Sequence, residues 1–156
     1  MLDVAQAETG ARPALELITF RVADQDFCVE AVDVKEIRGW TSATPTPDSP
    51  DYVRGVINLR GAVLPIVDLA ARLNLPSPEP SSRHVFIVVW IKRRLVGLLV
   101  DAVCDIVSAP AEAVQPTPSL QSGALETLVA ALVTVGDRMV ALLALDDILP
   151  VREAAP

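Results

Sequence analysis

The sequence predicts an all-β protein with a few short helices. Apolar and polar residues alternate over short stretches, as at Ile18, Phe20 and Val22, and this is the two-residue period of a half-buried strand. Short turn-forming segments separate neighbouring apolar runs, which is typical of β-hairpins. The apolar runs are much shorter than the roughly 20 residues of a membrane-spanning helix, so we expect no membrane insertion.

Hairpins account for the first half of the chain. In the turn Asn58-Leu59-Arg60-Gly61, Gly61 permits the positive φ that a tight turn often requires. Asp68 is placed to cap a short helix. The expected elements are a hairpin over residues 18–29, a helical or irregular turn over 31–37, a loop over 41–50, strands over 53–58 and 62–67, a helix over 69–73 and a loop over 76–82.

The second half is also predicted to consist of hairpins. Residues 85–91 and 98–100 are apolar on both faces, so we expect these strands to be buried on both sides, between two barrels. The expected elements are strands over residues 85–91 and 95–103 around a basic tip, a proline-containing loop over 110–123, and strands over 128–135 and 139–145.

A short internal similarity suggests that the fold contains two alike barrels. LPIVDL at residues 64–69 resembles LLALDD at 142–147, and Asp68 and Asp146 are both interpreted as helix caps. Chance similarity of two apolar strands followed by aspartate is the alternative. We expect flexible residues at 1–13, a folded region over 14–150 with a boundary near residues 60–80 and a C-terminal segment able to return to the first barrel, and a tail over 151–156.

The expected core consists of apolar residues on the inward faces of these strands. A shift of one residue in any strand would turn its whole set outward. The predicted buried positions are Ile18, Phe20, Val22, Phe27, Val29, Val56, Ile66, Val88, Leu98, Val100, Leu132 and Leu142.

Composition excludes several classes of protein. The 156 residues are 51% hydrophobic, which excludes disorder across the body of the chain, and the net charge of −7 disfavours nucleic acid as a partner. The first residues show no basic segment followed by an apolar run, so we expect a cytoplasmic protein. Cys28 and Cys104 have no CxxC partner and are each expected to be a buried free thiol.

Catalytic motifs are absent from the sequence. It contains one histidine, His84, and none of the patterns HExxH, paired CxxC, GxSxG or GxxxxGK[ST], so we expect no enzymatic activity, no metal and no cofactor. A histidine at the start of a strand is typically structural or solvated. The basic run Lys92-Arg93-Arg94 is interpreted as a soluble hairpin tip, with docking of an acidic partner as the alternative.

Several motifs resemble the CheW family of chemotaxis coupling proteins. They are VKEIRGW from Val34, VRGVINLRGAVLPIVDL from Val53, LVGLLVDAVCDIV from Leu95, and Gly136-Asp137-Arg138-Met139 before an apolar strand. The resemblance covers about residues 15–150. It implies two SH3-like five-stranded β-barrels packed on a shared hydrophobic core. It also implies a non-enzymatic scaffold, without cofactor, that joins the histidine kinase CheA, through its regulatory domain, to the cytoplasmic tips of methyl-accepting chemoreceptors.

The same motifs imply which residues face the receptor. A short apolar and charged segment beside a hairpin tip can form an apolar groove with charges at its rim. For Ile37, Val103 and Ile106, burial in the core is the alternative, and for Arg60 it is an ordinary solvated turn charge. The receptor-facing residues carried over by motif match are Val34, Glu36, Ile37, Arg38, Asn58, Arg60, Gly97, Val103 and Ile106.

Two other functions remain open at this stage. One is an adaptor of a signalling array that does not control chemotaxis, and the other is a small β-barrel module that binds a ligand, since a fold does not determine a function. Three departures from the family pattern bear on the contacts with the kinase, one of them the lack of a long final helix after Leu149-Pro150. The tip Lys92-Arg93-Arg94 lacks the glycine that family members often have, and residues 110–123 can adopt a conformation of their own.

Overall fold

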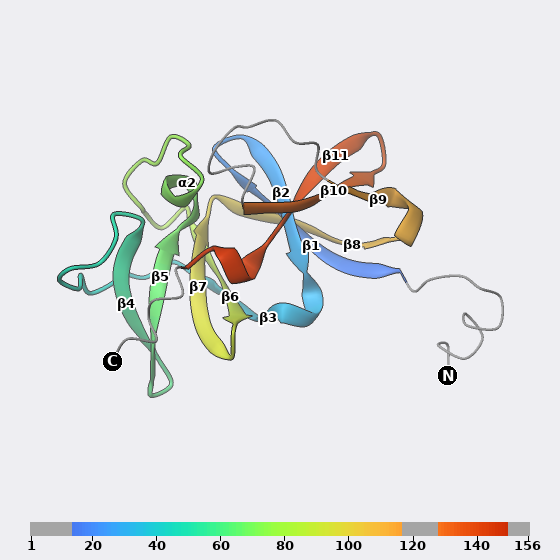
Figure 1. Ribbon diagram of the computed structural model, residues 1–156. Helices are drawn as coiled ribbons and strands as arrows, with labels where there is room; N and C mark the ends of the chain where they lie inside the picture. Colours follow the sequence, from blue (N-terminus) through green and yellow to red (C-terminus); the bar gives the residue numbers. More distant parts are fainter. Residues whose placement is uncertain (1–13, 117–127, 150–156) are drawn as a thin grey trace.

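The computed structural model describes residues 14–116 and 128–149, which form two packed β-sheets with short helical segments (Figure 1). The predicted all-β class with short helices is confirmed. The expected tails over 1–13 and 151–156, and most of the expected loop over 110–123, lie outside the described residues. The helical segments are η1 (Ala31–Asp33), α2 (Leu69–Arg72), η2 (Ala111–Ala113) and η3 (Leu145–Asp147).

The terminal sheet takes its strands from both ends of the described chain. Its order is β8-β1-β2-β11-β10-β9, and all neighbours are antiparallel except β2 and β11, which are parallel. Its strands are β1 (Leu15–Val22), β2 (Gln25–Glu30), β8 (Ala102–Ala109), β9 (Val114–Pro116), β10 (Val129–Val135) and β11 (Arg138–Leu143).

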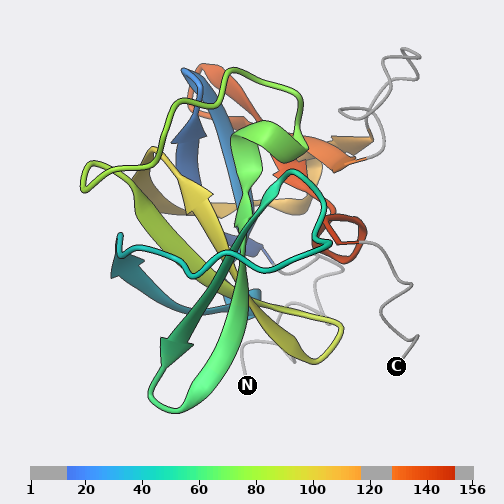
Figure 2. The same ribbon diagram turned by 90° about the vertical axis from the view of Figure 1, so that its left-hand side faces the viewer.

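The central sheet is built from the middle of the chain (Figure 2). Its order is β3-β6-β7-β5-β4, with β5 and β7 parallel and the other neighbours antiparallel. Its strands are β3 (Val34–Gly39), β4 (Val53–Leu59), β5 (Ala62–Asp68), β6 (Val85–Ile91) and β7 (Arg94–Val100).

The chain passes between the sheets at η1 and at Asp101, whereas the expected boundary region, residues 60–80, lies within the part of the chain that builds the central sheet. Residues 60–80 contain β5 and α2 and lie between β4 and β6, which are both strands of the central sheet. The crossing at Asp101 is held by two hydrogen bonds: its N–H donates to the Arg21 carbonyl, and its Oδ2 accepts from the Ala23 N–H, both at 2.9 Å. The C-terminal strands return to the first two strands, because β11 pairs with β2.

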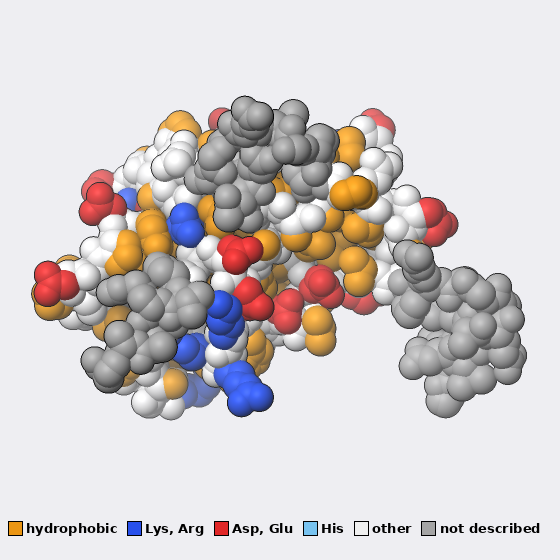
Figure 3. All heavy atoms as spheres, in the orientation of Figure 1, with side chains coloured by type: hydrophobic (Ala, Val, Ile, Leu, Met, Phe, Trp, Pro, Cys, Tyr) orange, Lys and Arg blue, Asp and Glu red, His pale blue; other side chains and the backbone are white. Residues whose placement is uncertain are grey.

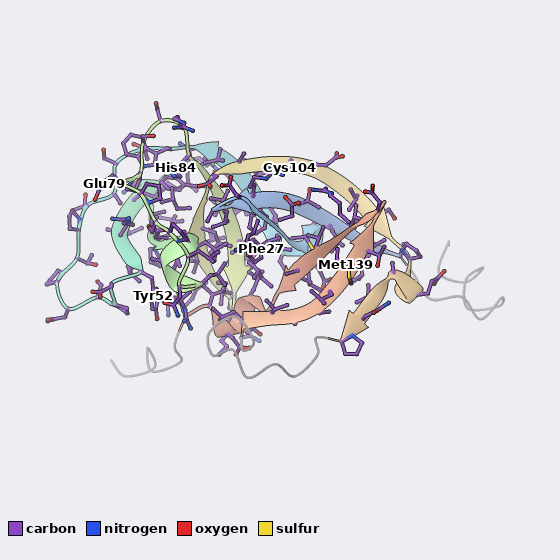
Figure 4. The ribbon with its side chains drawn as sticks, turned by 90° about the horizontal axis from the view of Figure 1, so that it is seen from above. Phe27, Tyr52, Glu79, His84, Cys104 and Met139 are labelled. Carbon is purple, nitrogen blue, oxygen red and sulfur yellow. The ribbon has the colours of Figure 1, made fainter. Side chains whose placement is uncertain are left out.

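Three clusters of buried side chains explain how the sheets pack. One lies within the terminal sheet and includes Leu17 and Val133, and another lies within the central sheet and includes Phe86. The third joins the two sheets and contains Phe20 and Phe27, whose ring centroids are 6.2 Å apart. Figure 4 shows Phe27 in the interior of the molecule. The two sheets therefore share a hydrophobic core.

Strand β6 lies between two of these clusters. Its residues Phe86 and Val88 contribute to the cluster of the central sheet, whereas Ile87 and Val89 contribute to the shared core. Successive side chains of a strand point to opposite faces, so a strand covered on both sides must be apolar throughout. The predicted burial of β6 on both faces is confirmed for Phe86 to Val89 and for Ile91, whereas Val85 is half-buried and Trp90 is 45% exposed.

The predicted core positions are buried except for Val56 and Leu132, which are half-buried. Both errors follow a β-bulge. The pairing of β4 shifts between Val53 and Gly55, and the pairing of β10 shifts between Val129 and Ala131. An extra residue in one strand exchanges the two faces from that point onward.

Several predicted boundaries also need correction. The expected turn over 31–37 ends after η1, because residues from Val34 onward pair with β6. The expected strand over 95–103 is broken at Asp101, where the chain changes sheets. Asp68 caps α2 as predicted, accepting from the Ala71 N–H at 3.3 Å, whereas Asp146 lies inside η3 and makes no cap hydrogen bond.

The two cysteines differ in their environment. Cys28 on β2 is buried, whereas Cys104 on β8 is exposed, so its expected burial is wrong. Figure 4 places Cys104 at the outer edge of the terminal sheet. Burial raises the pKa of the Cys28 thiol to about 12, with a smaller contribution from the nearby Glu30.

A buried polar network fixes the central sheet near α2. Asp68 is 3% exposed, and its Oδ2 accepts from Arg54 Nε and Nη2 at 2.9 and 2.7 Å and from Ser77 Oγ at 2.5 Å. The Asp68 carboxylate therefore caps α2 through Oδ1 and neutralises Arg54 through Oδ2. A buried charge is tolerated when it is paired and hydrogen-bonded in this way.

Arg72 connects α2 to the C-terminal part of the described chain. Its Nε donates to the Ile148 carbonyl at 2.5 Å, and its Nη2 donates to the Asp147 carbonyl at 3.0 Å. The guanidinium carbon lies 4.7 Å from the centroid of the Tyr52 ring, which is a cation–π arrangement. These contacts attach η3, which follows the terminal sheet, to the central sheet.

Candidate functional site

The segment VKEIRG forms β3, which is an edge strand of the central sheet. Burial alternates along it: Lys35, Ile37 and Gly39 are exposed, and Val34 is half-buried against the shared core. Ile37 is 42% exposed, so it is not a core residue. Because β3 has no strand on its outer side among the described residues, it presents an apolar side chain at an open edge.

Three of the predicted residues are brought together by ion pairs. Glu36 Oε1 accepts from Arg60 Nη2 at 2.6 Å, and Glu36 Oε2 lies 3.6 Å from Arg38 Nη1. The hydrogen bond from Arg60 lowers the pKa of Glu36, assisted by the positive charges of Arg60, Arg38 and Lys35. Arg60 lies in the turn after β4 and Glu36 lies on β3, so this pair links the two outermost strands of the central sheet.

The turn that carries Arg60 has an unusual backbone. Arg60 and Gly61 both have positive φ, 51° and 90°, and the Gly61 N–H donates to Asn58 Oδ1 at 2.9 Å. The positive φ predicted for Gly61 is confirmed, and Arg60 adopts it as well. Two successive residues of positive φ make the tight hairpin turn whose twist matches that of the strands. Asn58 stabilises the turn, and the Arg60 side chain remains 62% exposed.

Gly97 is buried in β7, beside β5. A Cβ at this position would lie 2.6 Å from Ile66 Cδ1 and 3.6 Å from Leu64 Cδ1. The glycine therefore makes room for the side chains of β5 in the cluster of the central sheet. It lies beneath the surface, and it shapes the sheet that carries the other residues.

Val103 and Ile106 lie on β8, in the terminal sheet rather than the central one. Ile106 is 63% exposed, opposite Ile18, whereas Val103 is half-buried and packs against the shared core. The predicted residues therefore fall into three groups. Glu36, Arg38 and Arg60 form a charged cluster, with the apolar Ile37 beside it on β3. Gly97 is buried in β7, and Val103 and Ile106 lie on β8 of the other sheet.

The lone histidine has a structural environment. His84 Nδ1 accepts from the Ser81 N–H at 3.1 Å, and His84 Nε2 lies 3.5 Å from Asp101 Oδ1. No group of three or more His, Cys, Asp or Glu side chains within residues 14–116 and 128–149 is arranged to hold a metal ion. No helix in this part of the chain is long and apolar enough to cross a membrane.

Two exposed apolar residues of the central sheet could not be recognised from the sequence. Val63 at the start of β5 is 65% exposed, and Trp90 near the end of β6 is 45% exposed. Both belong to continuous apolar runs, AVLPIV and VFIVVWI, in which no polar residue reveals which face is outward. Only the pairing of the strands assigns these side chains to the surface.

The described residues thus form an all-β domain of two sheets on a shared core, with apolar and charged side chains exposed at the sheet edges. The family model of the CheW-like domain matches residues 16–153. The chain belongs to the CheW family, which confirms the resemblance inferred from its motifs.

Named relatives agree with this assignment. The chemotaxis protein CheW of Rhizobium meliloti is 53% identical over 138 residues, 88% of this chain and 89% of the relative. The chemotaxis protein CheW of Klebsiella aerogenes is 31% identical over 94% of this chain and 88% of the relative. The crystal structure of the scaffolding protein TtCheW from Thermoanaerobacter tengcongensis superposes with a TM-score of 0.82 at 27% identity, covering 90% of this chain and 94% of that one. The family function is that of a chemotaxis scaffold or adaptor.

Proposed function

We propose that this protein is a non-enzymatic adaptor that couples methyl-accepting chemoreceptors to the histidine kinase CheA. It acts without a cofactor and is recruited to membrane-associated receptor arrays by binding the cytoplasmic tips of the receptors. The kinase contributes its regulatory domain to the complex. The main support is the family relationship across residues 16–153, together with relatives named for chemotaxis.

The receptor-facing surface that we propose centres on Ile37 and Arg60 of the central sheet and Ile106 of the terminal sheet. Each of these side chains is at least 42% exposed. Apolar side chains exclude water from an interface, and a charge at the rim selects the partner. Of the other carried-over residues, Glu36 and Arg38 form ion pairs beside Arg60, and Asn58 stabilises its turn. Val34 and Val103 pack against the shared core, and Gly97 lies buried within the central sheet.

A capture experiment tests the coupling function. Tagged protein is incubated with an extract of the bacterium that encodes it, and the retained proteins are identified by mass spectrometry. Recovery of both a histidine kinase and a chemoreceptor is the expected result. Recovery of neither, from an extract in which both are detected, would contradict the proposal.

Arg60 provides the sharper test. Arg60→Glu places a carboxylate beside Glu36, so we expect receptor recovery to fall strongly. Arg60→Asn also removes the charge, but asparagine adopts positive φ readily, so this variant should keep the turn and the thermal stability of the wild type. If Arg60→Asn binds the receptor as well as wild type does, Arg60 is not a contact residue.

A further inference from the structure

The two hairpin turns of the central sheet lie at the same end of it. β5 begins directly after the turn at Arg60 and Gly61, and β7 begins directly after the turn at Lys92 and Arg93. Because β5 and β7 are parallel neighbours, both turns must lie at the end where these strands start. Figure 2 shows both turns at the lower end of the sheet, the turn between β4 and β5 at the bottom and the turn between β6 and β7 to its right.

This end carries four basic residues, Arg60, Lys92, Arg93 and Arg94, and we call it the basic end of the central sheet. All four are exposed. Arg60 pairs with Glu36, whereas Lys92, Arg93 and Arg94 have no ion pair among the described residues. Figure 3 shows Lys and Arg side chains gathered beneath β6 and β7. Such a concentration is notable in a chain of net charge −7.

The turn at Lys92 and Arg93 is not built from residues that favour its shape. Their φ values are 50° and 71°, in the left-handed region that Asn-Gly adopts most easily. Lysine and arginine are therefore strained here, and they gain nothing from a neighbouring carboxylate of the described chain. The two-residue turn at Ala23 and Asp24 has nearly the same φ values, 50° and 66°, so what distinguishes the turn at Lys92 and Arg93 is its unpaired positive charge.

We infer that the basic end binds an acidic segment of the chemoreceptor. This inference rests on the proposed function, because it names the chemistry of the receptor where it meets Arg60. The Arg60 side chain already reaches from its turn to a carboxylate, Glu36 on β3, at 2.6 Å, which leaves Lys92, Arg93 and Arg94 as the unpaired positive charges of this end. Carboxylates of the receptor segment pair with Lys92, Arg93 and Arg94, and the exposed Val63 provides an apolar contact beside them.

A protein segment fits this end better than a lipid surface does. Both turns are two-residue turns on paired strands, so the backbone positions of the basic residues are fixed and suit a partner whose carboxylates are also held in place. A fluid anionic membrane does not require such positions. Arg60 is already paired with Glu36, and the three remaining residues, Lys92, Arg93 and Arg94, are fewer than the about four to eight basic residues of a typical lipid-binding cluster.

The test replaces the charges while improving the turn. Lys92→Asn/Arg93→Gly introduces the residues that the backbone prefers, so we expect the melting temperature to be equal to or above that of wild type. A single variant, Arg93→Gly, is also prepared, and its matched control is Arg83→Gln, which likewise removes one exposed arginine. Arg83 is exposed, lies before the opposite end of β6, and has no ion pair among residues 14–116 and 128–149.

The capture experiment identifies the receptor, and a cytoplasmic fragment of that receptor is then titrated against wild type and each variant. The titrations are made at two salt concentrations. We expect the double variant to bind about tenfold more weakly, at about threefold per exposed charge, and to lose part of the salt dependence. Arg83→Gln should bind like wild type. Equal affinity of the double variant and wild type would overturn this inference and leave the adaptor function intact.

Two further outcomes separate the possibilities. Failure of wild type to capture any receptor would refute the adaptor function, and this inference with it. Sedimentation with vesicles that contain 30% phosphatidylglycerol provides the lipid comparison. If wild type sediments and the double variant does not, while both bind the receptor fragment equally, the basic end binds lipid and the inference is wrong.

Discussion

Removal of the Asp68 carboxylate should destabilise the protein strongly, because this side chain both caps α2 and pairs with the Arg54 guanidinium. Asp68→Ala breaks the contacts with Arg54 and Ser77 and removes the cap of α2. Loss of one partner of a buried ion pair costs about 3–5 kcal/mol. The lower end of this range applies, because the Arg54 side chain is 28% exposed and can regain water.

The lost cap adds to this loss. An N-cap hydrogen bond stabilises a helix by about 1 kcal/mol, so the free energy of unfolding should fall by about 4 kcal/mol in Asp68→Ala. For a chain of this length, this corresponds to a decrease in melting temperature of about 8–16 °C. Asp68→Asn can keep the cap through its side-chain oxygen and should lose about 1 kcal/mol less.

Glu79 supplies the matched control for this experiment. It faces the same arginine, with Oε2 4.0 Å from Arg54 Nη1, but its side chain is 92% exposed. Exposed ion pairs contribute little, so Glu79→Ala should change stability by less than about 0.5 kcal/mol. Urea unfolding followed by circular dichroism measures all three variants. A loss in Asp68→Ala no larger than that in Glu79→Ala would refute the role assigned to the buried carboxylate.

Two further predictions concern other parts of the core. In a native titration with a thiol reagent at pH 8, Cys104 should react and Cys28 should not, because Cys28 is buried and its pKa of about 12 keeps it protonated; both should react in urea. Rapid reaction of two thiols in the folded protein would contradict this. Gly97→Ala should lower stability by about 1–3 kcal/mol, because its Cβ would lie 2.6 Å from Ile66 Cδ1. Ile66→Val removes that atom, so a double-mutant cycle should show partial rescue, and strictly additive losses would contradict the proposed contact.

Local signals in the sequence were sufficient to predict the class of fold. Alternation marked the hairpin of β1 and β2, a continuous apolar run marked β6 as buried on both faces, and Asp68 was correctly assigned as a helix cap. These features depend on residues close together in the chain, where the period of a strand or the start of a helix acts directly. The motifs from Val34 to Val107 likewise indicated the family.

Tertiary structure decided which strands share a sheet and which side chains meet. The crossing at Asp101, the return of β11 to β2 and the bulges in β4 and β10 depend on pairing between distant segments, which local periodicity does not contain. For the same reason, sequence patterns placed Arg60 in a turn but did not reveal Glu36 as its partner on another edge strand. Nor did they show that the turns at Arg60 and Lys92 share one end of a sheet, because that follows from the parallel pairing of β5 with β7.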